Sequence, residues 1–198
     1  MTLISRRRFL ELVLGLPVLA ACTRRAPEAD GQILPTTPAC GDGDDATPPQ
    51  TEGPFFKPAS PERTSLVESE TVGTPLIVAG SVLGTDCRPI AGALLDFWQA
   101  DDAGVYDNEG FALRGHQFAD DQGRWELGTV VPGLYPGRTR HIHVNVQAPN
   151  VPVLTTQLYF PAESANELDG IFDPALLMDV RETADGQRGG FTFVLDAS

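Results

Sequence analysis

Residues 135–143 of this chain read Tyr-Pro-Gly-Arg-Thr-Arg-His-Ile-His, and Val144-Asn145-Val146 follows directly. In a β-strand, side chains two residues apart point to the same face, so His141 and His143 would lie on one face, about 6.6 Å apart along the backbone. Ile142 and the two valines would point to the other face, into a core. Two imidazoles placed in this way can bind one metal ion, although the same pattern also fits a polar strand face with no ligand role.

The rest of the composition favours a fold of short strands. The chain has 198 residues, enough for one domain, and contains 20 glycines and 17 prolines. Only residues 162–178 suggest a helical turn or two beyond the N-terminal segment. Six runs of β-strand composition are separated by turn residues, at 76–83, 93–100, 123–131, 142–148, 154–160 and 191–195. We therefore predict an all-β domain, an antiparallel β-sandwich, over residues 51–198.

The first 50 residues predict an export signal and a tether. Ser5–Leu10 matches the twin-arginine export pattern, and the apolar run that follows is too short to span a bilayer. Leu19–Cys22 resembles a lipoprotein cleavage site, so we predict a signal peptide over residues 1–21 and a lipid on Cys22. Residues 22–50 would form a flexible linker. The protein would then be a periplasmic or cell-surface lipoprotein, held at the membrane only by its lipid.

Charge and cysteine content limit which partners the protein can bind and which compartment it can occupy. The formal net charge of −13 argues against nucleic acid and anionic membrane surfaces as partners. With Cys22 lipidated, Cys40 and Cys87 remain. In an oxidising compartment such a pair usually forms a disulfide; two free thiols, or a part in a metal site, are the alternatives.

A set of aromatic and polar segments accompanies the two histidines along the chain. In order, the segments are Thr51–Phe56, Trp98–Ala100, Gly104–Tyr106, Asp121–Trp125, Pro132–Pro136, His141–His143 and Thr156–Phe160. The set resembles the intradiol ring-cleavage dioxygenases, the family of protocatechuate 3,4-dioxygenase and catechol 1,2-dioxygenase. The resemblance covers roughly residues 40–160, and a pairing of Cys40 with Cys87 is similar to the exported branch of that family.

The resemblance implies a ferric ion, Fe(3+), held by two tyrosinates and two histidines. Carried over position by position, these ligands are Tyr106, Tyr135, His141 and His143. A free phenol has a pKa of about 10. A trivalent ion favours the phenolate strongly enough to deprotonate the phenol at neutral pH, and imidazole suits iron as well.

The resemblance also implies a reaction and two pocket residues. Family members cleave a catechol-type ring between its two hydroxyls with O2, giving a cis,cis-muconate-type diacid. Arg138 stands where the family has an active-site arginine, with Arg140 as a rival. Gln157 falls where the family has a pocket glutamine, although it could equally be a solvated rim residue. Tyr135 would be displaced by the substrate and would take up a substrate proton.

The chain departs from the family pattern in several places. Thr139 replaces the usual proline after the arginine, and the segment from Tyr135 to His141 is shorter than in many relatives. The insertions that build the substrate pocket of larger relatives are trimmed. His116 matches no ligand position, and we expect it in a solvated loop. These departures leave the predicted ligands unchanged, but they make the catechol used and the oligomeric state unpredictable from sequence.

Two other functions fit parts of the sequence. Gly80–Val82 and Pro89–Ala93 also resemble the start of transthyretin-like sandwiches, so a non-catalytic exported binding module is the main alternative. A zinc hydrolase that uses His141 and His143 is a third hypothesis. It is disfavoured because no third histidine or acidic ligand stands at the customary spacing.

Overall fold

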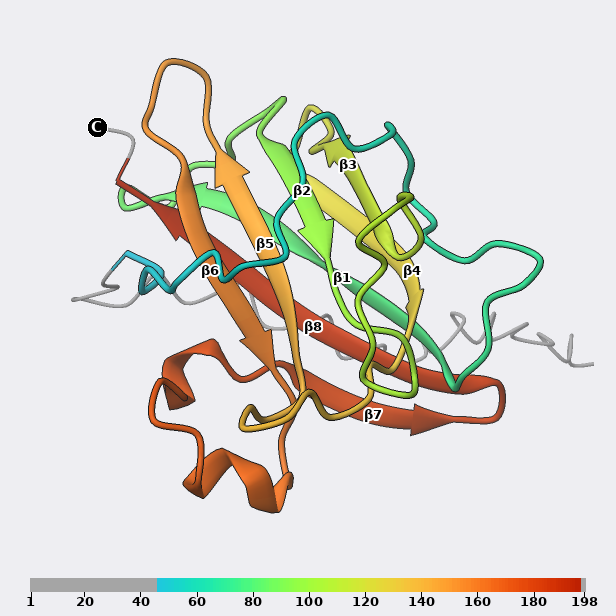
Figure 1. The fold of residues 1–198 in the computed structure, drawn as a ribbon. Coiled ribbons are helices and arrows are strands. Elements are labelled where there is room, and N and C mark those ends of the chain that lie inside the picture. Colours follow the sequence, from blue (N-terminus) through green and yellow to red (C-terminus); the bar gives the residue numbers. More distant parts are fainter. Residues whose placement is uncertain (1–45, 197–198) are drawn as a thin grey trace, which may run out of the picture. The chain divides into compact units, whose positions relative to one another are not determined.

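The computed structural model describes residues 46–196 (Figure 1). The predicted signal peptide, the lipidated Cys22 and Cys40 lie outside the described residues. Cys87 is described and stands in an exposed turn after the first strand. Its disulfide with Cys40 stays a prediction.

No helix within residues 46–196 is long and apolar enough to cross a membrane.

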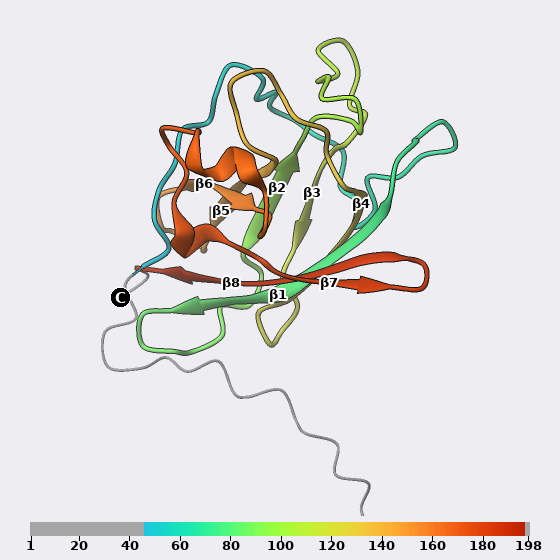
Figure 2. The same cartoon turned by 90° about the horizontal axis from the view of Figure 1, so that it is seen from below.

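The described residues form two four-stranded sheets packed face to face, as Figures 1 and 2 show. One sheet has the strand order β4-β1-β8-β7 and the other β3-β2-β5-β6. The all-β sandwich predicted from sequence is therefore confirmed, and the six predicted runs correspond to six of the strands; β3 and β7 were not predicted. The strands are β1 (Pro75–Gly84), β2 (Leu94–Trp98), β3 (Arg114–Phe118), β4 (Arg124–Val130), β5 (His141–Gln147), β6 (Leu154–Tyr159), β7 (Asp179–Thr183) and β8 (Gly186–Leu195).

One strand pair departs from the antiparallel prediction. β1 and β8 run parallel to each other, with Gly80 opposite Phe191, whereas the other strand pairs of the two sheets are antiparallel. Glycine at position 80 permits this close approach, because a Cβ there would overlap the carbonyl oxygen of Phe191. The first and last strands of the sandwich thus lie side by side in the middle of one sheet.

The core lies between the two sheets and fixes the register of β5. Ile142, Val144 and Val146 are fully buried and belong to one apolar cluster with Leu95 and Phe193, which come from β2 and β8. Full burial of each such side chain contributes about 1.5–3 kcal/mol. A slip of one residue would turn the whole apolar set outward. The core therefore holds the two histidines on the outer face of their sheet.

A strap of residues 46–66 lies along the edge and outer face of the histidine-bearing sheet (Figure 1). The Gln50 amide donates to the Thr155 carbonyl of edge strand β6, and Arg63 donates to His116 of β3 at the other edge. Thr47 is buried, and its amide donates to the Val194 carbonyl at 2.8 Å. Residues 46–50, which we assigned to the linker, thus pack against the sandwich.

His116 is not in a solvated loop, as the sequence suggested, but in the unpredicted strand β3. Its side chain is half-buried, and Nδ1 lies 2.8 Å from the Ser60 carbonyl oxygen of the strap. The Ser60 hydroxyl donates to Asp96 Oδ1 at 2.7 Å. His116 therefore has a structural role, in contact with the strap.

The predicted helical turns between residues 162 and 178 are present as two short 3-10 helices, η1 (Ser164–Glu167) and η2 (Pro174–Leu176). They belong to a segment that projects beside the ends of β6 and β7 (Figure 1). The loop between them reaches the outer face of the histidine-bearing sheet.

Candidate active site

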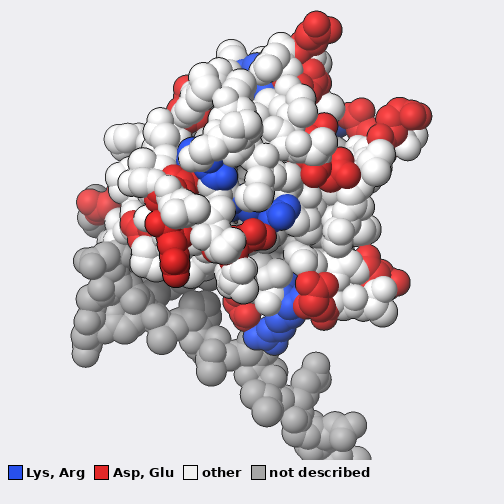
Figure 3. Space-filling view, turned by 60° about the horizontal axis from the view of Figure 1, so that its bottom comes forward, with Lys and Arg blue, Asp and Glu red and all other residues white. Residues whose placement is uncertain are grey.

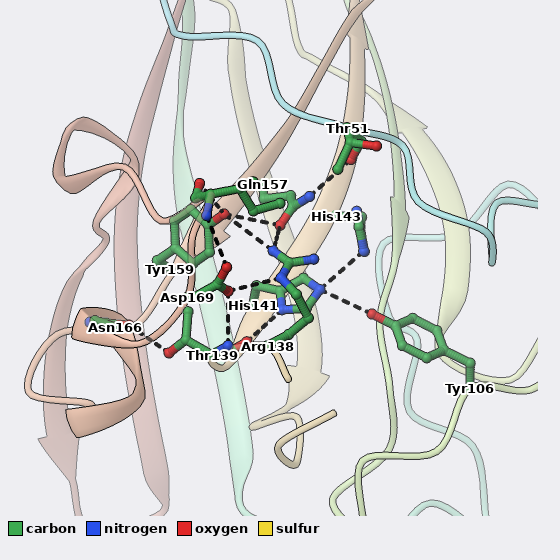
Figure 4. A network of polar contacts seen from close by, with 11 residues as sticks. Thr51, Tyr106, Arg138, Thr139, His141, His143, Gln157, Tyr159, Asn166 and Asp169 are labelled. Carbon is green, nitrogen blue, oxygen red and sulfur yellow. Dashed lines mark hydrogen bonds and ion pairs between the residues drawn. The ribbon is translucent and has the colours of Figure 1, made fainter. Parts of the chain in front are cut away.

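Three nitrogen and oxygen donors converge at the beginning of β5. His141 Nε2 lies 3.1 Å from His143 Nε2 and 3.2 Å from the Tyr106 hydroxyl oxygen (Figure 4). The two imidazoles come from one strand, as their spacing predicts, and Tyr106 comes from the loop between β2 and β3. All three side chains are buried. The sequence thus brings three of the four predicted metal ligands to one point.

These distances fit a metal site. Ligand atoms bonded at about 2.0–2.2 Å to one ion stand about 2.9–3.5 Å from one another. His141 Nδ1 lies 2.6 Å from the Thr139 carbonyl oxygen. Nδ1–H donates a hydrogen bond to this oxygen, which leaves Nε2 unprotonated, with a lone pair for a metal ion. Burial lowers the pKa of His141 to about 4 and the pKa of His143 well below its usual range. Both imidazoles are therefore neutral at pH 7 and can act as ligands.

Tyr106 adds an oxygen donor that would lose its proton only when a cation is bound. Burial raises the pKa of the Tyr106 phenol to about 12, although the Arg138 guanidinium acts to lower it. The phenol therefore keeps its proton at pH 7 unless a bound cation stabilises the phenolate. Two neutral imidazoles and a phenolate would fit a hard, highly charged metal ion such as Fe(3+).

Tyr135, the fourth predicted ligand, stands at the rim of this cluster. Its ring lies edge-on to Tyr106, with centroids 5.9 Å apart, and edge-on to Phe55 at 5.3 Å. Its side chain is half-buried, and within residues 46–196 no hydrogen bond joins its hydroxyl to the other three donors. The structure therefore places Tyr135 beside the donors in a less enclosed position.

Aromatic rings enclose the donors. Trp98 stacks on His143 with centroids 4.8 Å apart, and Phe55 stacks on Tyr106 at 4.3 Å. The strap passes close to the site here, because a Cβ at Gly53 would lie 3.5 Å from His143 Cε1. Arg114, which sequence reasoning missed, fixes this arrangement by donating to the Phe55 carbonyl oxygen at 2.5 Å and to Asp107, beside Tyr106.

The two predicted pocket residues meet next to the donors. Arg138 Nη2 donates to Gln157 Oε1 at 2.6 Å, and Gln157 Nε2 donates to the Thr51 carbonyl oxygen of the strap at 2.9 Å. Gln157 is fully buried and pairs with His143 across β5 and β6, so it is not a solvated rim residue. Tyr159, two residues further along β6, donates to the same Gln157 oxygen at 3.1 Å.

Arg140, the rival arginine, has other partners. It pairs with Glu163 at 2.7 Å and donates to the Pro132 carbonyl oxygen. Both Arg140 and Glu163 line a separate cleft of about 930 Å³, whose lining includes none of the predicted ligands. The structure therefore favours Arg138 as the arginine of the site.

Sequence reasoning missed one further residue of the site, Asp169. Its carboxylate accepts from Arg138 Nε at 2.8 Å, and its side chain is only 2% exposed. Burial acts to raise the pKa of Asp169, but hydrogen bonds from the Thr139 and Ile171 amides and the ion pair with Arg138 outweigh it and lower the pKa. A half-buried arginine requires a counter-charge, but no spacing pattern pointed to a carboxylate 31 residues away.

The zinc alternative finds no support in the described part of the chain. Among residues 46–196, no group of three or more His, Cys, Asp or Glu side chains is placed to hold a metal ion. The donor cluster depends instead on tyrosine. That composition separates it from the usual structural and catalytic zinc sites.

Comparisons with known proteins agree with this geometry. The model of the Dioxygenase family matches residues 51–196. The chain is 31% identical over 178 residues to 6-chlorohydroxyquinol 1,2-dioxygenase of Cupriavidus pinatubonensis, covering 76% of this chain and 64% of that enzyme. It is 29% identical to hydroxyquinol 1,2-dioxygenase of a Rhizobium species, covering 69% of this chain and 56% of that enzyme. The chain thus spans less than two thirds of either relative.

Solved structures extend the similarity. The dioxygenase domain of a dioxygenase and carbohydrate-binding protein fusion from the cellulolytic bacterium Streptomyces sp. SirexAA-E is 63% identical. Its TM-score is 0.76, with 78% of this chain and all of that domain covered. Hydroxyquinol 1,2-dioxygenase from Pseudomonas putida is 26% identical with a TM-score of 0.67, covering 76% of this chain and 66% of that one.

Proposed function

The chain belongs to the intradiol ring-cleavage dioxygenase family, and we propose that it is an Fe(3+)-dependent enzyme that cleaves a catechol-type ring between its two hydroxyls. With O2 as co-substrate, the product would be a cis,cis-muconate-type diacid. One observation carries the proposal. The Tyr106 hydroxyl oxygen and His143 Nε2 both lie within 3.2 Å of His141 Nε2, and Tyr135 stands beside them.

Four residues would hold the iron: Tyr106, Tyr135, His141 and His143. When bound, ferric iron would supply Lewis acidity and a template for the two substrate oxygens. Phenolate ligands favour the trivalent ion over the divalent one, because hard anionic oxygens interact more strongly with the higher charge. The rings of Trp98 and Phe55 stack on His143 and Tyr106, and the donors are buried.

The residues around the donors would accept a proton, stabilise charge and orient the arginine. Tyr135 is half-buried at the rim, so it can leave the donor set and accept a proton from a substrate hydroxyl at its own oxygen. Arg138, permanently charged, would stabilise the negative charge that builds up on the bound catecholate ring during the reaction. Gln157 orients Arg138 through the 2.6 Å hydrogen bond and is itself fixed by Thr51.

The relatives suggest the substrate class. Several of them are named for hydroxyquinol or a chlorinated hydroxyquinol, and others for catechol. We propose a small ortho-diphenol of this kind as the substrate. A transthyretin-like binding module has no need of one tyrosine and two histidines at one point with a second tyrosine beside them, so the donor cluster favours an enzyme.

The test uses the purified protein and its colour. Iron bound by tyrosinates should give a red-brown protein, and anaerobic addition of a catechol should shift the visible band to longer wavelength. Admission of O2 should bleach the shifted band and release a diacid. A ring-opened semialdehyde would indicate cleavage beside the hydroxyls and contradict the proposal. A colourless protein that takes up no iron and leaves catechols intact would return the chain to the binding-module alternative.

Arg138→Ala provides the second arm of this test. Iron and colour should persist, because no predicted ligand is removed. Turnover should slow, with the activation free energy raised by about 2–4 kcal/mol, if the guanidinium stabilises charge as an oxyanion donor does. Turnover unchanged from the unsubstituted enzyme would remove Arg138 from the reaction.

We also propose export by the twin-arginine pathway, a lipid anchor on Cys22 and a Cys40–Cys87 disulfide. Mass spectrometry of the mature protein checks the anchor and the disulfide. It should find a lipidated N-terminal Cys22 and, after digestion without reductant, one peptide pair joined through Cys40 and Cys87. An unmodified N-terminus beyond Cys22, or two free thiols, would contradict the corresponding part.

A further inference from the structure

The loop between η1 and η2 contributes a buried carboxylate that contacts two separate parts of the site. Oδ2 of Asp169 accepts from Arg138 Nε at 2.8 Å and from the Thr139 amide at 2.9 Å, and Oδ1 accepts from the Ile171 amide at 3.1 Å (Figure 4). One oxygen atom is therefore shared between an arginine side chain and the backbone of the next residue.

The first contact fixes the guanidinium. Arg138 is held at Nε by Asp169 and at Nη2 by Gln157, so its plane is determined from two sides. In Figure 4, Nη1 has no dashed contact to another of the residues drawn. An arginine held in this way keeps one nitrogen for an anionic ligand and does not have to reorient when that ligand binds.

The second contact fixes the backbone that orients a predicted metal ligand. The Thr139 amide donates to Asp169, and the Thr139 carbonyl oxygen lies 2.6 Å from His141 Nδ1. The Thr139 hydroxyl donates to Asn166 Oδ1 at 2.6 Å, and Asn166 donates to the Phe160 carbonyl oxygen at 3.0 Å. A proline at position 139 could make neither Thr139 contact, since it has no amide hydrogen and no hydroxyl.

Asp169 differs from most acidic groups of the protein in being buried. Acidic groups are spread over the face shown in Figure 3, in keeping with the net charge of −13. Most such groups are solvated and screened, whereas the Asp169 side chain is 2% exposed and paired. A buried charge is held only where it is fully hydrogen-bonded, so replacing it changes its partners directly.

We propose that Asp169 is a positioning residue that sets Arg138 for the substrate and His141 for the metal through one carboxylate oxygen. The inference rests on the proposed function, since the substrate in question is a catecholate. Asp169 itself is not expected to touch the substrate or the iron.

The decisive variant is Asp169→Asn, with Glu167→Gln as its matched control. Both replace a carboxylate by an amide in the same segment, but Glu167 is exposed. In Asp169→Asn, kcat should fall about 10- to 100-fold, as when a partner that supports a metal ligand is lost. The KM should change much less, because the interaction acts mainly in the transition state. Glu167→Gln should stay within twofold of the unsubstituted enzyme.

Iron release gives a readout that does not depend on activity. The iron-loaded proteins are mixed with a ferric chelator, and the loss of the visible band is followed. Asp169→Asn should lose iron about tenfold more readily than Glu167→Gln, because the carbonyl that orients His141 is no longer held. Iron release indistinguishable from that of Glu167→Gln would overturn the part of the proposal that concerns His141.

A double-mutant cycle separates positioning from general damage. If part of the effect of Asp169 on turnover passes through Arg138, then Asp169→Asn should lower kcat by a smaller factor in the Arg138→Ala background than in the unsubstituted enzyme. Additive losses would overturn the part that concerns Arg138. Should Asp169→Asn fail to fold, Asp169→Glu keeps the charge, moves it by one methylene group, and enters the same cycle and the same chelator assay.

These readouts distinguish failure of the inference from failure of the proposed function. If the unsubstituted protein binds iron but cleaves no catechol, the proposed function is wrong, and the chelator assay still decides whether Asp169 positions His141. If catechol is cleaved and both Asp169→Asn readouts match Glu167→Gln, the proposed function stands and the inference is wrong.

Discussion

The two faces of β5 are both buried, but they owe their burial to different parts of the molecule. On the inner face, Ile142, Val144 and Val146 are covered by the opposite sheet. On the outer face, His141 and His143 are 5% and 2% exposed, and their cover comes from the strap and the loops that carry Tyr106 and Arg138. An apolar face is buried by the sandwich itself, whereas the polar face requires a cover assembled around it. Substitutions on the two faces should therefore fail in different ways.

The largest effect is expected on the outer face. His143→Ala removes a predicted metal ligand, so iron binding should weaken by more than about 100-fold, beyond the effect of losing a supporting partner. Activity and colour should disappear together, while the far-ultraviolet circular dichroism spectrum stays that of the folded protein. Asn145→Ala, on the same face of the same strand and opposite Thr155, is the control and should keep its iron. A coloured, active His143→Ala variant would show that the outer face is not a metal site.

A substitution on the inner face should do the reverse. Leu95→Ala, in the core part of β2, should lower the free energy of unfolding by about 2–5 kcal/mol, because a fully buried leucine leaves a cavity. The folded fraction should bind iron and turn over substrate normally. Urea unfolding followed by intrinsic fluorescence gives the stability, and iron content per folded molecule gives the comparison. Loss of iron without loss of stability would contradict the separation of the two faces.

Acid should act on the buried imidazoles of the outer face. Burial lowers the pKa of His141 to about 4 in the folded protein, compared with about 6.5 in an unfolded chain. The unfolded chain therefore takes up a proton first. The contribution of His141 to the stability of the metal-free protein should be complete above about pH 6.5 and fall between about pH 6.5 and 4, by up to about 1.4 kcal/mol per pH unit. His143, whose pKa is also lowered by burial, should add to this slope. Urea unfolding across this range checks the slope, which His141→Gln should flatten. Stability that rises on acidification would contradict the buried, neutral imidazole.

The smallest effect is expected where the strap meets the edge of the sandwich. Thr47→Val removes the hydroxyl that accepts from the Val194 amide at 2.8 Å and should cost about 0.5–1.5 kcal/mol. Because this contact lies away from the donor cluster, iron content and kcat should not change. Thermal unfolding and a turnover assay on the same sample test both statements. A drop in kcat at unchanged stability would mean that the strap controls the site directly.

The same contrast explains how much could be predicted from sequence. Alternating residues such as those of β5 fix a strand, its register and its inner face, because the pattern is local. The donor cluster could be predicted because Tyr106, Tyr135, His141 and His143 follow one another in the order found in a known family. β3 was missed because Arg114 and His116 break the apolar alternation, and both are held by partners distant in sequence.

Asp169 could not have been found in this way. Its contacts to Arg138 and Thr139 cross from one loop to another, and neither loop has a periodic pattern. The sequence shows that Thr139 replaces the usual proline of the family. Only the structure shows what this residue does, because its amide donates to the Asp169 carboxylate. The Pro- and Thr-rich composition of residues 46–50 likewise gave no sign of their hydrogen bonds to β6 and β8.

The parallel pairing of β1 with β8 has a consequence for the order in which the domain can fold. β1 has β4 on one side and β8 on the other, so its second neighbour is residues 186–195. Until the ribosome has released those residues, that edge of β1 offers unpaired backbone groups to any other chain nearby. Contacts between such distant residues are also slow to form. Synthesis and folding of this domain should therefore be consecutive events, and a chaperone that shields the edge of β1 would raise the yield of folded protein.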